Sequence, residues 1–398
     1  MAAFSSSSKN WNSLINSFGW SVTRFQWSKP CFNAGSFLEN LIKKYDNLSI
    51  FLNTRVLKFN QVDANANVSS VELAIGQEYR CELKARLYVL AAGGIETPRI
   101  LLNSTDQEQK GLGNRSGALG RYFSTHPKAN VGILHLSEPV RLNTPMFVDT
   151  KQNDLNLRFG LARKLETSDN PQSLNHYVQF SAKFEKLGAN LLEHVRQSKV
   201  LNSRKRQRGV PARTLFGGVR SRIQLFAIVA GRVFFNVIGK IGILQRSASI
   251  VTLRGFFDQY PNADHSVRLC DATDQYGMRK AQVSWAFSSK DMESVREFLS
   301  DLKRDFEKSG IGNLVVTLPD SGRRLTGIHS HFLGTARMGN NPKSSVANLD
   351  GRIHDCENLY LAGSSLFPSY GYANPVLTIC AVSIRTAEKI DGVLSKGR

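Results

Sequence analysis

Two histidines stand two positions apart in the segment GIHSHFLGTARMG, residues 327–339. If this segment is extended, the imidazoles of His329 and His331 leave the same face of the strand. A neutral imidazole titrates near physiological pH, so it can take up a proton from a reacting hydroxyl group. The pair is therefore a candidate for acid–base chemistry.

Two other segments join a short apolar strand to a helix through glycines. In RLYVLAAGGIETPRILLNS, residues 86–104, Gly93-Gly94 separates the strand from the helix. In NLYLAGSSLFPSYGYANPVLTI, residues 358–379, the strand runs into Gly363-Ser364-Ser365, and a helix opens at Asn374-Pro375 after a loop. Turns of this kind let the backbone approach a phosphate or a flavin ring closely.

The rest of the chain must position these segments. Residues 1–34 are rich in Ser and Asn and show no clear period, and the glycine-rich stretch 111–120 lacks the GxGxxG spacing, so we interpret it as an ordinary connection. Strands are predicted at 49–59, 68–75, 79–84 and 86–91. Helices are predicted at 36–45, 95–103 and 290–308, with a buried terminal helix from Pro375 to about residue 394.

Composition limits the class of protein. A length of 398 residues favours two domains or one large discontinuous domain, and the net charge of +20 suggests an anionic partner. Five cysteines without a CxxC pair argue against a disulfide framework and a thiolate zinc site. The N-terminus has no secretory signal pattern, and no uncharged apolar run is long enough to span a bilayer. We therefore expect a cytoplasmic protein.

The positive charge is concentrated in one segment. Between His194 and Phe257 there is no Asp or Glu, but there are 13 Lys or Arg residues. One interpretation is a solvated basic loop followed by core structure. The alternative is docking of residues 194–257 on an anionic membrane surface or a partner, because the basic stretch 203–208 precedes an apolar one. Nucleic acid is disfavoured, since no recognition motif accompanies the charge.

Together these segments resemble the C-terminal part of the glucose–methanol–choline (GMC) family of flavoprotein oxidoreductases. The matching stretches are VLAAGGIETPRILLNS, GLGNRSGALGRYFSTHP, the series PNADHSVRL, DATDQYG and VSWAFSSKD, then HFLGTARMG and NLYLAGSSLFPSYGYANPVLTI. They run from about residue 49 to the end, in the family's order. The resemblance implies FAD as cofactor and an alcohol or sugar as the small-molecule substrate, oxidised at a CH–OH group.

The resemblance also implies roles for individual residues. His331, in the family's H-x-x-G-T motif, and Asn374, before the last helix, would be the catalytic residues, with His331 as the general base for hydride transfer to flavin N5. His329 would line the pocket, and His126, in STHP, would lie where the chain enters the substrate domain. A metal site from His126, His329, His331 and His354 lacks an HExxH or carboxylate pattern, so no metal ligand is assigned. The residues that would contact the cofactor are Val56, Gly93, Gly94, Gly363, Ser364, Asn374 and Pro375.

The family's N-terminal strand–GxGxxG–helix unit has no counterpart in this chain. We therefore expect an α/β protein with an incomplete, Rossmann-like FAD-binding domain (residues 30–120 and 330–398). A discontinuous antiparallel-sheet substrate domain would occupy residues 121–329, with the basic insertion at about 194–257. Catalysis would then need an N-terminal FAD-domain polypeptide or segment. The alternative is a catalytically silent GMC remnant or subunit that docks on an anionic membrane or partner through its basic segment.

Overall fold

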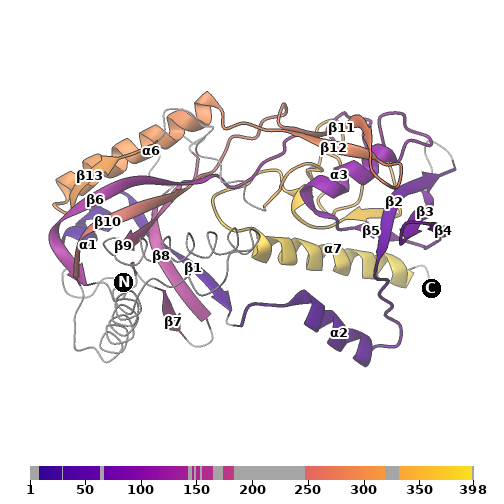
Figure 1. Cartoon of the computed structure of the whole chain (residues 1–398), viewed down its shortest axis with the longest axis horizontal. Coiled ribbons are helices and arrows are strands. Elements are labelled where there is room, and N and C mark those ends of the chain that lie inside the picture. Colours follow the sequence, from indigo (N-terminus) through magenta and orange to yellow (C-terminus); the bar gives the residue numbers. More distant parts are fainter. Residues whose placement is uncertain are drawn as a thin grey trace, which may run out of the picture.

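The computed structural model describes residues 9–28, 30–62, 67–141, 146–147, 149–152, 155–164, 174–182, 247–318 and 331–396. These residues form two lobes, each with its own apolar core (Figure 1). We name them the sheet lobe and the glycine-turn lobe. Both contain helices and antiparallel strands, which confirms the expected mixed α/β class.

The sheet lobe is built on a seven-stranded antiparallel sheet of described strands, in the order β1-β8-β9-β10-β6-β13, with β7 paired to β8. The pairing of β1 with β8 is regular over its whole length, from Trp20 opposite Arg163 to Ser28 opposite Leu155. The strands are β1 (Trp20–Ser28), β6 (Lys128–Arg141), β7 (Thr150–Gln152), β8 (Leu155–Arg163), β9 (Tyr177–Ala182), β10 (Ser247–Phe256) and β13 (Gly312–Val316).

Helix α6 (Ser289–Lys308) covers one face of this sheet (Figure 1). Its N-terminus is closed by a capping box between Ser288 and Asp291, which satisfies backbone N–H groups of the first turn. Its apolar stripe, including Val295, Phe298 and Leu302, is buried in the lobe's core. Helix α1 (Lys9–Ser17) adds Trp11 to the same core, where its ring contacts Phe180 of β9 and Phe306 of α6.

The N-terminal prediction needs correction. Residues 1–34 show no clear period, yet the structure has helix α1 and strand β1 within them. The Trp20 ring is fully buried, and its Nε1 donates to Asp305 Oδ2 on α6 at 2.9 Å. This strand is therefore held by a contact with α6, 285 residues away, and such a contact produces no hydrophobic period in the local sequence.

The glycine-turn lobe contains the short strands predicted before the glycine pair. Strands β2 (Thr54–Gln61), β3 (Val68–Ile75) and β4 (Tyr79–Leu83) form an antiparallel sheet. Strand β5 (Tyr88–Leu90) pairs in parallel with β14 (Leu359–Leu361), which brings the two strand–glycine segments side by side. Helix α3 (Gly93–Asn103) packs Ile100 and Leu101 into the core.

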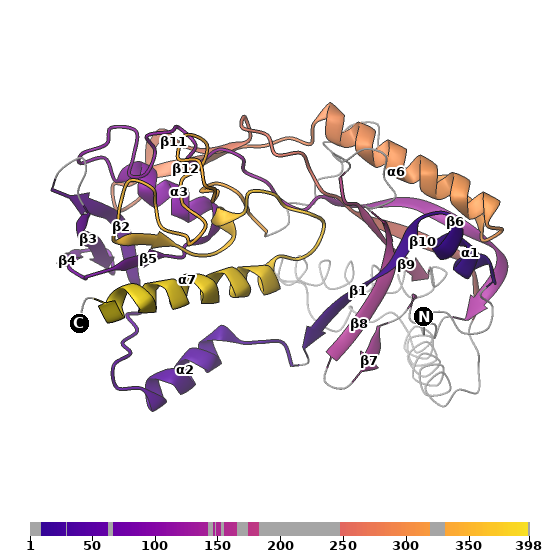
Figure 2. The same cartoon turned by 180° about the vertical axis from the view of Figure 1, so that it is seen from behind.

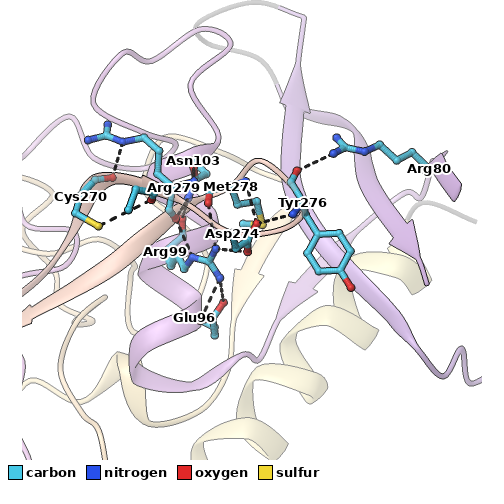
Figure 3. Close-up of polar contacts among 10 residues, drawn as sticks. Arg80, Glu96, Arg99, Asn103, Cys270, Asp274, Tyr276, Met278 and Arg279 are labelled. Carbon is cyan, nitrogen blue, oxygen red and sulfur yellow. Dashed lines mark hydrogen bonds and ion pairs between the residues drawn. The ribbon is translucent and has the colours of Figure 1, made fainter. Parts of the chain in front are cut away.

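A hairpin of β11 (Ser266–Thr273) and β12 (Arg279–Ser284) closes the outer side of α3. Arg99 of α3 holds it: the buried guanidinium pairs with Asp274 at 2.5 Å and Glu96 at 3.1 Å, and donates to the Arg279 carbonyl at 2.9 Å (Figure 3). Arg80 of β4 adds a hydrogen bond to the carbonyl oxygen of Tyr276. The hairpin thus joins the glycine-turn lobe, although it lies within the range expected for the substrate domain.

Helices α2 (Ala34–Lys44) and α7 (Val376–Lys396) are much less buried than α6. Helix α2 buries no residue and lies apart from both lobes in the two views (Figures 1 and 2). In α7 the one buried residue is Thr386, whereas Val376 and Leu377 expose 60% and 77% of their surface. The prediction of a buried terminal helix is therefore wrong, because amphipathic spacing marks an apolar face but not what covers it.

The basic segment 194–257 lies outside the described residues up to residue 246, and His329 also lies outside them. Among the residues that the structure does describe, no helix is long and apolar enough to cross a membrane. Along the chain, the sheet lobe and the glycine-turn lobe alternate: β1 comes before β2–β5, and β13 comes before β14 and α7.

Candidate functional site

The H-x-x-G-T segment at residues 331–335 lies between the two glycine turns. The Ser364 hydroxyl donates to the Phe332 carbonyl at 2.6 Å, and the Gly334 N–H donates to the Ser364 carbonyl at 3.1 Å. On the other side, the Thr335 hydroxyl donates to the carbonyl of Gly94 at 2.8 Å. Three segments singled out from the sequence are therefore joined by direct hydrogen bonds.

The two turns require glycine for different physical reasons. A Cβ at Gly94 would clash with the backbone of Phe332, so Gly94 permits the close packing of the two segments. Gly93 and Gly363 have φ angles of +80° and +103°, and a Cβ at either would meet no atom within 4 Å. These two residues combine a left-handed backbone with open space beside it, as expected where a ligand approaches the main chain.

His331 contacts a second imidazole. Its Nδ1 lies 3.1 Å from Nδ1 of His126, and the two rings meet edge to face with 5.3 Å between centroids. His126 lies between the β-bridge at Ser124 and strand β6, and its side chain is fully buried. The sequence interpretation placed His126 at the entry to the substrate domain without a part in the site, so the structure adds a residue there.

Burial, together with a smaller effect of positive charge on His331, lowers the pKa of His126 to about 4. Hydrogen bonding to the backbone of Tyr370 and Gly371 opposes this lowering. The Nε2 atom of His126 is buried without a partner of standard hydrogen-bond geometry in the described part of the chain. His126 is therefore a neutral imidazole at physiological pH, placed against the loop that leads to α7.

That loop is fixed at two points. The Tyr370 hydroxyl donates to the carbonyl of Tyr122 at 2.5 Å, and the Gly371 N–H donates to Oδ1 of Asp258 at 2.9 Å. Burial raises the pKa of Asp258 to about 6, although it accepts N–H groups from Gln259, Asn175 and Gly371. Asp258 and Tyr370 thus position the loop, and neither was selected from the sequence.

An aromatic group lies beside the same loop. The rings of Tyr372 and Tyr177 are stacked, with 5.2 Å between centroids and 8° between planes. Phe25 and Phe256 contact this pair, and Lys128 Nζ lies 5.2 Å from the centre of the Phe256 ring. The loop to α7 therefore meets a surface of the sheet lobe that is aromatic and carries positive charge.

The other predicted site residues take the following places. Asn374 is exposed in the loop that leads to α7, three residues after Gly371. Pro375 is buried, and its carbonyl accepts the N–H of Ile379 as α7 begins. Val56 lies in β2, paired with Leu73 and packed against the core of the glycine-turn lobe.

The imidazole pair is not part of a larger cluster of metal-type ligands. In the described ranges, no group of three or more His, Cys, Asp or Glu side chains could hold a metal ion. His354 lies elsewhere and shares a hydrogen bond of 2.8 Å with the Ser345 hydroxyl. The chemistry that this arrangement could support is proton transfer at His331, near the main chain at Gly93 and Gly363, where the space beside Cα is open.

Comparison with known families agrees with this geometry. Residues 261–383 match the family model described as GMC oxidoreductase. This range contains the His331 segment and the loop to α7, and the resemblance of the C-terminal portion to the family is confirmed.

Curated relatives extend the match along the chain. A 2-methyl-1,2-propanediol dehydrogenase of Mycolicibacterium austroafricanum is 26% identical over 78% of this chain and 49% of its own length. The fructose dehydrogenase large subunit of Gluconobacter japonicus is 22% identical over 85% of this chain and 53% of its own length. A 6'''-hydroxyparomomycin C oxidase of Streptomyces lividus is 30% identical over 35% of this chain and 25% of its own length. The chain thus spans a quarter to about half of these relatives.

Proposed function

We propose that this chain forms the C-terminal, substrate-facing part of an FAD-dependent GMC-type oxidoreductase that oxidises a CH–OH group of an alcohol or a sugar. The observation that carries the proposal is the seating of His331–Thr335 between the Gly93–Gly94 turn and the Ser364 turn, through the bonds of Thr335 and Ser364. The relatives' names include dehydrogenases of a diol and of fructose, which supports a polyhydroxylated substrate.

The residues around His331 fit a flavin. Gly93 and Gly363 offer left-handed backbone with open space beside it, and Asn374 is exposed beside buried Pro375 at the start of α7. These residues, with Gly94, Ser364 and Val56, would hold the cofactor. Since the Ser364 hydroxyl already donates to Phe332, its contribution would be to fix the turn while the backbone faces the cofactor.

His331 would remove the proton of the substrate hydroxyl as the C–H bond breaks. A neutral imidazole suits this task because its conjugate acid has a pKa close to physiological pH. Asn374 would hold the substrate oxygen through its amide N–H without competing for the proton. FAD, when bound, would accept the hydride from the same carbon, which leaves a carbonyl product.

A second element of the proposal is a segment with a strand–GxGxxG–helix unit, which no part of the 398-residue sequence supplies. Such a unit would seat the pyrophosphate at a helix N-terminus and complete a Rossmann-like sheet begun by the parallel strands β5 and β14. The surface on which this unit would dock includes exposed apolar residues, namely Leu377 and Ile384 of α7 and Val89 of β5. Covering them would remove apolar area from water, at about 25 cal/mol per Å².

The test is co-expression of the full chain with a polypeptide that carries the GxGxxG half of a GMC relative. We expect a yellow complex that is bleached anaerobically by a sugar or an alcohol. His331→Ala should keep the bound flavin but slow bleaching roughly 10²- to 10⁴-fold, the usual contribution of a general base. His354→Ala, a histidine outside the site, should bleach at the wild-type rate. Equal rates for His331→Ala and wild type would contradict the role of His331.

The 13 cations of residues 194–257 support a second candidate function, docking of a catalytically silent subunit on an anionic membrane. The wild type should then co-sediment with vesicles that contain phosphatidylserine. A variant with Arg204, Lys205, Arg206 and Arg208 changed to Gln should stay in the supernatant. Equal sedimentation of both proteins would contradict this function.

A further inference from the structure

A pocket lies between the hairpin, the end of α3 and the glycine-rich stretch 111–120. Its volume is about 440 Å³, which is in the range of small-molecule sites. The described lining comes from all three elements and includes Leu102 of α3, Asn114 and Arg268 of β11. It includes none of the residues assigned above to catalysis or cofactor binding, so the pocket is separate from the site around His331.

The pocket is lined by positive charge without counter-charge. Four cationic residues line it, and its described lining contains no Asp or Glu: Lys110, Arg121, Arg268 and Arg279. Within the described residues, the first three form no ion pair, and Arg279 pairs only with the fully exposed Asp271, at 3.4 Å. Like charges gathered in this way repel one another, and a bound anion would relieve that repulsion.

The walls that carry two of these cations are fixed by hydrogen bonds. Nε of Arg279 donates to the carbonyl oxygen of Cys270 at 3.1 Å (Figure 3), and its Nη2 donates to that of Leu269 at 3.4 Å. Leu269 itself lines the pocket, so the guanidinium group is held at the pocket's edge. Arg121 forms a β-bridge with Ser266, which fixes its backbone beside β11. The site is therefore organised before a ligand binds, which lowers the cost of binding.

The glycine-rich stretch provides the shape of the pocket rather than hydrogen bonds to a ligand. Gly120 has a φ angle of +81°, and a Cβ there would clash with the carbonyl oxygen of Val267. Glycine therefore permits the close approach to β11. The N–H groups of Gly117, Ala118, Leu119 and Gly120 already donate within the protein. A ligand would consequently be held by side chains, in agreement with the lack of GxGxxG spacing in this stretch.

Ser266 adds an independent observation. It lines the pocket and is only 1% exposed. Its Oγ atom has no hydrogen-bond partner in the part of the chain that the structure describes. Because buried hydroxyl groups normally have a partner, this one is unusual. Rotation about the Cα–Cβ bond toward the pocket would let the hydroxyl donate to an oxygen of a bound anion.

We propose that this pocket binds a small organic phosphate. Its phosphoryl group would contact Lys110, Arg121 and Arg268, and its carbon skeleton would pack on the half-buried side chains of Leu102 and Leu269. The planar guanidinium group binds phosphate oxygens in pairs. A phosphate monoester carries a charge of about −1.5 to −2 at pH 7, which suits several cations better than the single charge of a carboxylate. The proposal does not depend on the proposed oxidation.

The test is equilibrium dialysis of the full chain against radiolabelled glucose 6-phosphate. A salt concentration of about 0.15 M screens the long-range attraction of any anion to this basic protein. We expect saturation at one molecule per chain. Inorganic phosphate should compete more weakly, because it has no carbon skeleton, and unphosphorylated glucose should not compete. Since no flavin is needed, failure of this inference is distinguishable from failure of the proposed function.

Two double variants provide the comparison. Arg121→Gln with Arg268→Gln should weaken the binding of glucose 6-phosphate at least roughly tenfold, because charge-assisted hydrogen bonds are lost. Arg24→Gln with Lys303→Gln is the matched control: it removes the same charge from exposed positions of the sheet lobe and should leave binding unchanged.

Hydrogen exchange of the wild type gives a measurement that needs no variant. Glucose 6-phosphate should increase the protection of amides in residues 110–121 and 266–269, which form the pocket's walls. The inference is overturned if no saturable binding occurs, if these amides are unaffected, or if both double variants weaken binding equally. It is also overturned if glucose competes as well as its phosphate, or if only a polyanion such as heparin binds.

Discussion

Helices α6 and α7 are of nearly equal length but are buried very differently. The 20-residue α6 buries six apolar residues, from Met292 to Phe306, against the seven-stranded sheet. The 21-residue α7 buries only Thr386 and leaves Val376, Leu377, Ile384 and Val393 exposed. The sheet lobe is thus covered by its own chain on the α6 face of the sheet, whereas the glycine-turn lobe is covered on its α3 side and leaves α7 exposed. The exposed α7 side is where we propose that a further polypeptide segment packs.

The largest expected effect tests the closed side of the glycine-turn lobe. Arg99→Met should lower the free energy of unfolding by about 3–5 kcal/mol, because it leaves partly buried Asp274 without its charged partner. Lys58→Met removes the more exposed pair with Asp106, which does not involve the hairpin, and should lower it by less than about 1 kcal/mol. Urea unfolding followed by circular dichroism measures both. Similar losses would mean that the hairpin does not close this lobe.

The second prediction compares the two helices directly. Leu302→Ala in α6 should destabilise the protein by about 2–5 kcal/mol, because it leaves a cavity in a closed core. Leu377→Ala in α7 removes an exposed side chain and should change the free energy of unfolding by less than about 0.5 kcal/mol. If Leu377→Ala destabilises the chain alone as much as Leu302→Ala does, α7 is already covered and the comparison fails.

The third prediction concerns the loop between the lobes. The pKa of Asp258 is raised to about 6, so between about pH 4 and pH 6 the folded state holds a proton that the unfolded chain releases. Its contribution to stability therefore falls as the pH rises through this window, by about 3 kcal/mol for a shift of about two units. Asp258→Asn removes this loss, so its stability relative to wild type should rise between pH 4 and pH 7.

The contributions of His126 and His176 to stability change with pH in the opposite direction. Their pKa values are lowered to about 4 and about 3, so their contributions to stability are lost as the pH falls below about 6.5. Both histidines remain in Asp258→Asn and therefore cancel in the comparison with wild type. The exposed Asp271→Asn serves as the control for the change in charge. If the difference in the free energy of unfolding between Asp258→Asn and wild type does not depend on pH, the pKa of Asp258 is not raised.

The smallest expected effect concerns α2. A helix of 11 residues without a buried side chain is marginal in water, so its amides should open at a free-energy cost of less than about 1 kcal/mol. Hydrogen exchange read by mass spectrometry should show α2 exchanging with little protection and α6 with strong protection. In complex with the GxGxxG polypeptide, the amides of α7 should gain protection. Strong protection of α2 in the chain alone would show that it is already packed.

The sequence predicted the elements whose burial is local. Helix α6 and the strands and helix around Gly93 follow from apolar period, glycine turns and a proline in the first turn of α3. Strand β1 was missed because its partner β8 lies more than a hundred residues away, and the burial of α7 was wrongly predicted because an amphipathic face does not reveal its cover.

The candidate site shows the same limit. The H-x-x-G-T segment and the two glycine turns have local patterns, and the structure joins them by hydrogen bonds. His126, Asp258 and Tyr370 have none, since each acts on a segment more than a hundred residues away in sequence. The roles of His331 and Asn374 in catalysis remain predictions, for which the tests above are designed.

The order in which the chain builds its lobes has a mechanical consequence. It passes from β1 to β2, from α3 to β6, from β10 to the hairpin, from the hairpin to α6, and from β13 to β14. Several covalent connections therefore tie the lobes together, so a single proteolytic cut in one of them would release neither. Any opening that admits a bulky substrate must bend several backbone connections together, which favours small, concerted displacements over a wide hinge motion.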